Sequence, residues 1–277
     1  MKIFQLKIWK HSYKNLFTQL TDYLQNNQTE KGISVFTPNP EICLKTLEDR
    51  DFLWVLSQAD YLTSDGIGLY IWYQINNSYF PKIIKFFLIP YYIFNILFRK
   101  KMLYEKYGER ICGSDLTRWL VEYAQAHKIR IAILDPYFPQ DREKCESQKT
   151  FQQKLQKKFP ELLFDFYIQD FTSKEWFYQK ICDSDAKIFF ATLGMKKQEI
   201  AVLDILDECP NIRLWLAVGS SFDYFTGFQK RAPKIFRDAG FEWLYRIFTS
   251  PNKLKRLGRI YQALIVFPIK VLMYKNK

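Results

Sequence analysis

The stretch "KIFFATLG", residues 187–194, is a short apolar run that ends in glycine. Apolar side chains at successive positions predict a strand that is buried on both faces, as strands in parallel sheets are. Five further runs are predicted as strands: "ISVFTP" (33–38), "ADYLTS" (59–64), "RIAIL" (130–134), "LFDFYI" (163–168) and "LWLAVG" (214–219). Several of these are also nearly all apolar, which favours a parallel sheet.

Segments with the period of an amphipathic helix lie between these runs, at residues 40–59, 114–128, 142–159 and 196–209. The alternation of strands and helices predicts an α/β fold. No G-x-G-x-x-G or G-x-x-x-x-G-K-[ST] loop follows a predicted strand. The sequence therefore lacks the main motifs of the common dinucleotide-binding and P-loop folds.

The composition is that of a globular protein with a sizeable core, since 48% of the 277 residues are hydrophobic. The five cysteines are odd in number and form no C-x-x-C pair, so neither a disulfide framework nor a zinc site is predicted. The first residues lack the apolar stretch of a signal peptide. We therefore expect a cytoplasmic protein in a reducing compartment.

The net charge of +12 is concentrated in two segments. Residues 230–277 carry 12 Lys and Arg against 2 acidic residues, and residues 82–110 carry 7 against 2. Both mix basic with aliphatic and aromatic residues, which is typical of helices in a membrane interface. Buried core helices remain the alternative for each. The apolar run 86–98 is shorter than the roughly 20 residues that a membrane crossing needs. A nucleic-acid partner is not expected, because the charges border apolar residues.

Ligands of parallel sheets bind beyond the carboxyl ends of the strands, so the residues there are candidates for the functional site. They are Thr37, Asn39, Asp65, Asp135, Gly194, Gln198, Gly219 and Asp223. Asp65 is the strongest candidate for a general base, because Gly66 after it leaves room for a substrate hydroxyl. The alternative is an ordinary Asp-Gly turn.

Other candidates have simple structural alternatives. Thr37 and Asn39 offer a hydroxyl and an amide just before a helix, where they are equally suited to cap it. Arg110 precedes a Gly-Ser-Asp turn and is either a phosphate ligand or a surface residue. His11 and His127 are interpreted as surface residues. The "DSD" at 183–185 precedes a strand and is expected at the opposite edge, so no metal site is implied.

Six motifs together resemble one family, the WecG/TagA/CpsF bacterial glycosyltransferases. They are "TPNPE" (37–41), "DGIG" (65–68), "ERICGSDL" (109–116), "LGMKKQE" (193–199), "VGSSFDYFTGFQKRAP" (218–233) and "GFEWLYRIF" (240–248). Each alone is weak, but their order and spacing match over most of residues 30–250.

The resemblance implies a Rossmann-like domain and an inverting, metal-independent transfer that uses no cofactor. A sugar, typically N-acetylmannosamine, would pass from a UDP donor to a sugar on a polyprenyl diphosphate carrier. Asp65 would be the catalytic base, with Thr37 and Asn39 beside it. The implied substrate-binding residues are Arg110 and Gln198, together with Arg231 and Arg246 of the C-terminal arm. The other strand-end candidates, Asp135, Gly194, Gly219 and Asp223, are assigned to substrate binding as well.

The expected organisation is a glycosyltransferase domain (1–229) with an aromatic and basic insert near 76–108, followed by a membrane-associating appendage (230–277). Three features depart from the family: Asp135-Pro136 in place of a Gly-Gly pair, Lys196 in place of a proline, and the length of the insert. The resemblance implies a peripheral protein on the inner face of the cell membrane and leaves a homo-oligomer open. The alternative is an inactive protein that binds the sugar nucleotide or the lipid carrier.

Overall fold

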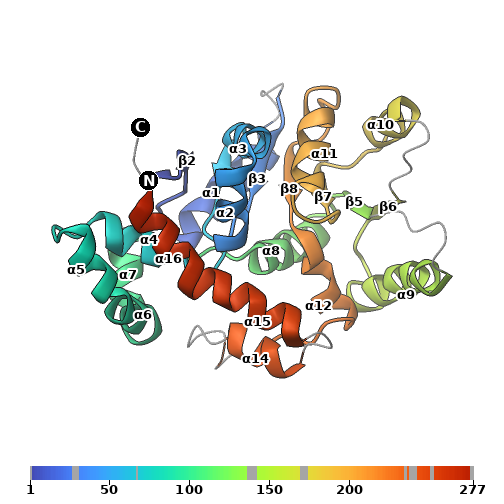
Figure 1. The fold of residues 1–277 in the computed structure, drawn as a ribbon. Helices are drawn as coiled ribbons and strands as arrows, with labels where there is room; N and C mark the ends of the chain where they lie inside the picture. Colours follow the sequence, from blue (N-terminus) through green and yellow to red (C-terminus); the bar gives the residue numbers. More distant parts are fainter. Residues whose placement is uncertain are drawn as a thin grey trace.

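The computed structural model describes residues 2–26, 31–66, 68–135, 142–168, 174–233, 236, 242–249 and 253–274. Its centre is a six-stranded sheet of order β4-β3-β8-β7-β5-β6 (Figure 1), in which all neighbouring strands are parallel. The strands are β3 (Ile33–Phe36), β4 (Tyr61–Leu62), β5 (Ile131–Asp135), β6 (Phe164–Ile168), β7 (Ile188–Ala191) and β8 (Leu214–Ala217). Each strand overlaps one of the predicted runs, so the parallel α/β fold is confirmed.

Both faces of the sheet are buried. Along β7, Phe189 and Ala191 belong to one apolar cluster, whereas Ile188 and Phe190 belong to the other. Helices whose buried side chains join the first cluster include α2 (Pro40–Glu48), α3 (Arg50–Ser57), α4 (Leu69–Asn76), α11 (Lys197–Leu206) and α16 (Phe267–Met273). The second cluster includes side chains of α1 (Tyr13–Gln25), α8 (Gly113–Ala126), α9 (Arg142–Lys158), η1 (Gly219–Phe222) and α12 (Asp223–Thr226). The continuous apolar character of the strands follows from this two-sided packing.

The helix predicted over residues 40–59 is in fact two helices, α2 and α3. Asp49 separates them: its backbone is extended, and its Oδ1 accepts a hydrogen bond from the amide of Phe52 at 3.0 Å. A short polar side chain that caps the next helix competes with helix continuation, which explains the break. The hairpin β1 (Lys2–Ile3) and β2 (Leu6–Lys7) and the helices α1 and α10 (Lys174–Cys182) were not predicted from the sequence.

The insert forms three short helices, α5 (Lys82–Phe87), α6 (Ile89–Phe98) and α7 (Lys100–Tyr107), at one end of the molecule (Figure 1). Gly108 ends it with φ +90°, and a Cβ there would lie 2.5 Å from the carbonyl carbon of Lys10. Only glycine fits such a position, so the return of the insert toward the sheet is sterically fixed. None of the described helices is long and apolar enough to cross a membrane.

The C-terminal part runs through α14 (Glu242–Thr249), α15 (Lys253–Tyr261), a π-helical turn η2 (Gln262–Val266) and α16. Phe267, Val271 and Leu272 of α16 are buried in the first apolar cluster. The ring of Phe267 meets that of Phe4 edge to face, with centroids 5.8 Å apart. The last helix is therefore part of the core, and the boundary after residue 229 stays a prediction.

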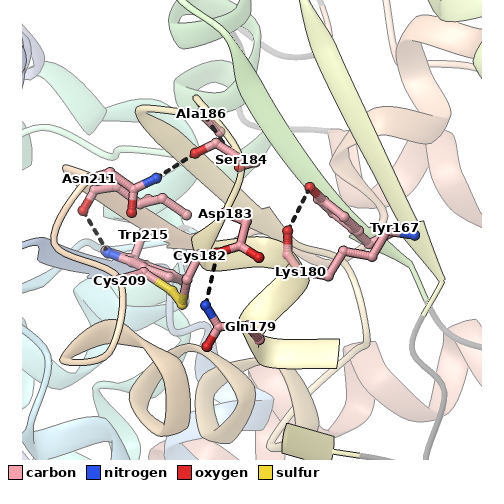
Figure 2. The surroundings of a disulfide bond; sticks show 11 residues. Tyr167, Gln179, Lys180, Cys182, Asp183, Ser184, Ala186, Cys209, Asn211 and Trp215 are labelled. Atoms are coloured by element: carbon pink, nitrogen blue, oxygen red, sulfur yellow. Dashed lines mark hydrogen bonds between the residues drawn. A yellow bond between two sulfur atoms is a disulfide. The ribbon is translucent and has the colours of Figure 1, made fainter. Parts of the chain in front are cut away.

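One prediction about the cysteines is wrong, because Cys182 and Cys209 form a disulfide (Figure 2). Cys182 ends α10 before β7, and Cys209 follows α11 before β8. Since β7 and β8 are neighbours, the two cysteines meet although 27 residues separate them. Sequence spacing alone could not show this pairing.

The "DSD" turn follows Cys182 of the disulfide directly. It lies at the edge of the sheet where β7 begins, as predicted. Asp183 accepts a hydrogen bond from the side-chain amide of Gln179 at 2.8 Å (Figure 2).

Candidate active site

The carboxyl ends of the parallel strands place most of the predicted site residues along one edge of the sheet. In the order of the strands, Asp65 follows β4, Thr37 and Asn39 follow β3, Gly219 follows β8, Gly194 follows β7 and Asp135 ends β5. Residues far apart in the sequence thus share one edge. This is the edge at which open α/β sheets bind ligands.

Asp65 and Arg110 are brought together by two adjacent loops. The amide of Ile111 donates to the carbonyl of Ser64 at 3.2 Å, and the hydroxyl of Thr63 donates to the carbonyl of Ile111 at 3.2 Å. The residues before Asp65 therefore run alongside the residues after Arg110. Both side chains are half-buried. A carboxylate and a guanidinium consequently share the β4 end of this edge.

Thr37 lies against the start of α8. A Cβ at Gly113 would come within 2.9 Å of the Thr37 hydroxyl oxygen, so the glycine allows this close approach. The backbone amide of Asp65 donates to the carbonyl of Pro38 at 3.0 Å. These contacts place Thr37, Asp65 and the loop of Arg110 in one small region.

Asn39 caps α2, since its Oδ1 accepts a hydrogen bond from the amide of Ile42 at 2.9 Å. Asn39 is thus a helix cap, which was the structural alternative to a role in the site. A contact between Asn39 and substrate stays a prediction. Gly68 has a packing role too, because a Cβ there would lie 2.7 Å from Cγ of Pro40. Gly66 has φ +96°, a conformation natural to glycine. Ile67 of the "DGIG" motif is outside the described residues.

Gln198 connects the ends of β7 and β8. Its backbone amide donates to the carbonyl of Gly194 at 3.1 Å, and its side-chain oxygen accepts from the amide of Gly219 at 2.9 Å. Its side-chain nitrogen donates to Oε1 of Glu199 at 2.9 Å. Gln198 therefore fixes the two glycine turns relative to each other.

Glu199 was not among the predicted site residues. It is 1% exposed, and burial raises the pKa of its carboxyl group. Helical spacing was the missed signal, because Glu199 lies on the same face as Val202 and Leu206, three and seven residues further on. By accepting the hydrogen bond from the side-chain nitrogen of Gln198, the buried carboxyl group of Glu199 orients that side chain.

Asp135 and Asp223 form a second polar group at this edge. Asp135 accepts hydrogen bonds from the Thr192 hydroxyl and from the Gln148 amide, both at 2.7 Å. Asp223 accepts one from the Gln229 amide at 2.8 Å. Burial raises the pKa of Asp135, and burial together with the nearby Asp135 charge raises the pKa of Asp223 to about 6. Pro136, which follows Asp135, is outside the described residues.

The raised pKa of Asp223 predicts a pH-dependent stability. In the unfolded chain its pKa is 3.8, so between about pH 4 and 6 the unfolded state loses its proton first and stability falls as pH rises. Above about pH 6 this loss in the free energy of unfolding stays constant, because Asp223 is ionised in both states.

Asp223→Asn keeps an acceptor for Gln229 and is expected to raise the free energy of unfolding at pH 7.5 by about 1–3 kcal/mol. Urea unfolding at pH 7.5 and pH 3.5 measures this, and the gain should vanish at pH 3.5. An equal change at both values, or the same gain in the exposed-site control Asp183→Asn, would contradict it.

Arg231 attaches the segment after α12 to the start of α8. Its Nη2 donates to the Ser114 hydroxyl at 3.1 Å and forms an ion pair with Asp115. The guanidinium also lies over the ring of Tyr224, 5.7 Å from its centroid. Arg231 is thus beside the start of α8, near Gly113 and Thr37, and its role in substrate binding stays a prediction. Arg246 belongs to α14, but its side chain is outside the described residues.

Residues 1–90 and 95–277 match the family model of the glycosyl transferase WecG/TagA/CpsF family. The chain belongs to this family. The family resemblance predicted from the six motifs is confirmed, and the protein is a glycosyltransferase.

Two curated relatives resemble this glycosyltransferase over most of its length. One, from Bacillus subtilis (strain 168), is 26% identical over 246 residues, which cover 87% of this chain and 81% of the relative. The other, from Bacillus spizizenii, is 27% identical over 241 residues, 86% of this chain and 78% of the relative. Both are N-acetylglucosaminyldiphosphoundecaprenol N-acetyl-beta-D-mannosaminyltransferases.

Proposed function

We propose that this glycosyltransferase moves N-acetylmannosamine from a UDP donor to N-acetylglucosamine on a polyprenyl diphosphate carrier, in the synthesis of a cell-surface polysaccharide. The observation that carries the proposal is the meeting of the Asp65 and Arg110 loops at the carboxyl edge of the sheet. The names of the two relatives support the choice of sugar and acceptor.

In the proposed reaction, the Asp65 carboxylate accepts the proton of the acceptor hydroxyl. The hydroxyl oxygen then bonds to the anomeric carbon from the face opposite UDP, and the bond from that carbon to the UDP oxygen breaks. UDP leaves with the electron pair, so one displacement inverts the anomeric centre. A half-buried carboxylate that follows a buried strand and precedes Gly66 is suited to this task.

The departing UDP gains negative charge, which the site has to stabilise. Arg110 supplies a positive charge near Asp65, and the helices α2 and α8 both begin in this region. Backbone amides at helix N-termini and guanidinium groups both favour phosphate oxygens. We therefore propose that the diphosphate is bound by these groups without a metal ion.

A lipid-linked acceptor requires the enzyme to work at a membrane surface. In the C-terminal part, Leu254, Leu257, Tyr261 and Ile265 are exposed, and their spacing puts them on one side of the continuous helix α15–η2. Lys253 on the same helix adds positive charge, whereas Arg259 forms an ion pair with Glu41 of α2 at 3.4 Å. We propose that this segment associates with the inner face of the cell membrane.

The reaction is tested by UDP release from the purified protein. With UDP-N-acetylmannosamine and a short-chain lipid-diphosphate-N-acetylglucosamine, we expect release that requires both substrates and continues in EDTA. UDP-N-acetylglucosamine and UDP-glucose serve as control donors. Binding of the donor without release from any pair would contradict transfer and favour the inactive binding protein. Release from another donor alone would contradict the sugar assignment.

A further inference from the structure

The insert displays its apolar side chains from a fixed scaffold. Tyr92 and Ile96 of α6 are buried in the first apolar cluster. Asn95 donates its amide to Oε1 of Gln74 at 2.8 Å, and the Gln74 amide donates to the carbonyl of Tyr92 at 3.0 Å. These buried contacts fasten one side of α6 to α4. The other side is therefore held in a defined orientation.

That other side exposes an unusual amount of apolar surface. Phe87 is 72% exposed and Phe98 64% exposed. On α6, Tyr91, Phe94 and Phe98 are spaced three and four residues apart and so form one stripe. The exposed apolar residues of the insert are Tyr79, Phe80, Ile83, Ile84, Phe86, Phe87, Tyr91, Phe94, Phe98 and Met102. Surfaces of this kind in soluble proteins mark a binding partner.

The charge around these residues identifies the kind of partner. Residues 66–104 contain no Asp or Glu, and their basic residues are Lys82, Lys85, Arg99, Lys100 and Lys101. The guanidinium of Arg99 lies 5.8 Å from the ring centroid of Phe94, so apolar and cationic groups are interleaved. Aromatic side chains at the acyl boundary combined with cations at the headgroups characterise helices bound to anionic membranes.

We propose that the insert α5–α7 is a second membrane-docking element, whose partner is the surface of an anionic bilayer. Its helices have 6, 10 and 8 residues, so they lie in the interface. α5 also packs against α16, which joins the insert to the C-terminal helices (Figure 1). The two docking segments are thus connected through α16.

The position of the insert connects docking to the reaction; this step rests on the proposed function. The insert leaves the sheet after the Asp65 loop and α4, and it returns at Gly108, two residues before Arg110. The Tyr70 hydroxyl of α4 donates to the carbonyl of Gly108 at 2.9 Å, which ties the two ends together. A bilayer held by α5–α7 therefore fixes the distance between the lipid headgroups and the site.

Vesicle sedimentation of the full chain tests the proposal. Phe87→Ser with Phe98→Ser removes two exposed rings, and Trp54→Ser with Leu163→Ser is the matched control elsewhere on the surface. We expect the first variant to bind vesicles of phosphatidylglycerol and phosphatidylcholine on the order of ten-fold more weakly, with the control unchanged. Lys82→Gln with Lys101→Gln should weaken binding to these vesicles and leave binding to pure phosphatidylcholine unchanged.

Three outcomes would overturn docking: unchanged vesicle binding by the Phe87 and Phe98 variant, an equal loss in the control, or a dimer in light scattering that only this variant abolishes while vesicle binding stays the same. UDP release with the short-chain acceptor in solution separates docking from catalysis. It should be unaffected by these substitutions, since neither ring belongs to the site. If no variant or wild-type protein releases UDP while vesicle binding depends on the insert, docking stands and the proposed reaction fails.

Discussion

Asp65→Asn is expected to lower the rate of UDP release by about 10²–10⁴-fold, the usual contribution of a general base. The substitution keeps the size of the side chain and removes the proton acceptor. The backbone hydrogen bond from Asp65 to the Pro38 carbonyl does not depend on the carboxylate, so the fold should persist. Steady-state kinetics with the short-chain acceptor measures the effect, and urea unfolding confirms that stability is kept.

The matched control for Asp65 is Asp183→Asn, an exposed aspartate at the opposite edge of the sheet. It should change the rate by less than about two-fold, because surface substitutions away from a site are nearly neutral. Full activity of the Asp65 variant would eliminate the proposed base. A smaller loss with an unchanged pH profile would assign Asp65 to substrate positioning.

Arg110→Gln is expected to lower the rate by about 10²–10³-fold, as loss of one preorganised donor to a developing negative charge does. Burial raises the pKa of the Tyr104 hydroxyl, and the nearby Arg110 charge partly opposes this, which indicates that the guanidinium lies near α7. The backbone next to Arg110 is hydrogen-bonded to the backbone next to Asp65. The effect should appear in kcat and kcat/KM together, since the charge on UDP grows in the transition state.

Arg118→Gln is the control for Arg110, because Arg118 forms an exposed ion pair with Glu122 one turn away on α8. Exposed pairs of this kind contribute little to stability. The Arg110 assignment fails if its variant keeps wild-type kcat, or if the Arg118 variant loses as much.

The fold was predictable because its signal is local. Each strand is a short apolar run, and two-sided burial explains why these runs do not alternate. The strand-end candidates followed from the same pattern, since parallel strands put their carboxyl ends together. The split of helix 40–59 at Asp49 was missed because a capping aspartate and an exposed helical aspartate look alike in sequence.

Contacts between distant segments were not predictable. The Cys182–Cys209 bond, the bridge of Gln198 between two glycine turns and the contact of Arg231 with Ser114 all depend on which strands become neighbours. The hydrophobic pattern of one segment does not predict which strands will be its neighbours in the sheet. Glu199 is different, because its helical spacing with Val202 placed it on the inner face and was overlooked.

The strand order β4-β3-β8-β7-β5-β6 has a consequence for biosynthesis. β8 is the last strand of the sheet to leave the ribosome, yet it lies in the middle and joins β3 to β7. Until Leu214–Ala217 emerge, the nascent chain holds two separate blocks of strands with their inner edges unpaired. Such edges attract other chains, so this interval is when the growing polypeptide is most open to aggregation. Completion of the sheet and assembly of the carboxyl edge therefore coincide in one late event.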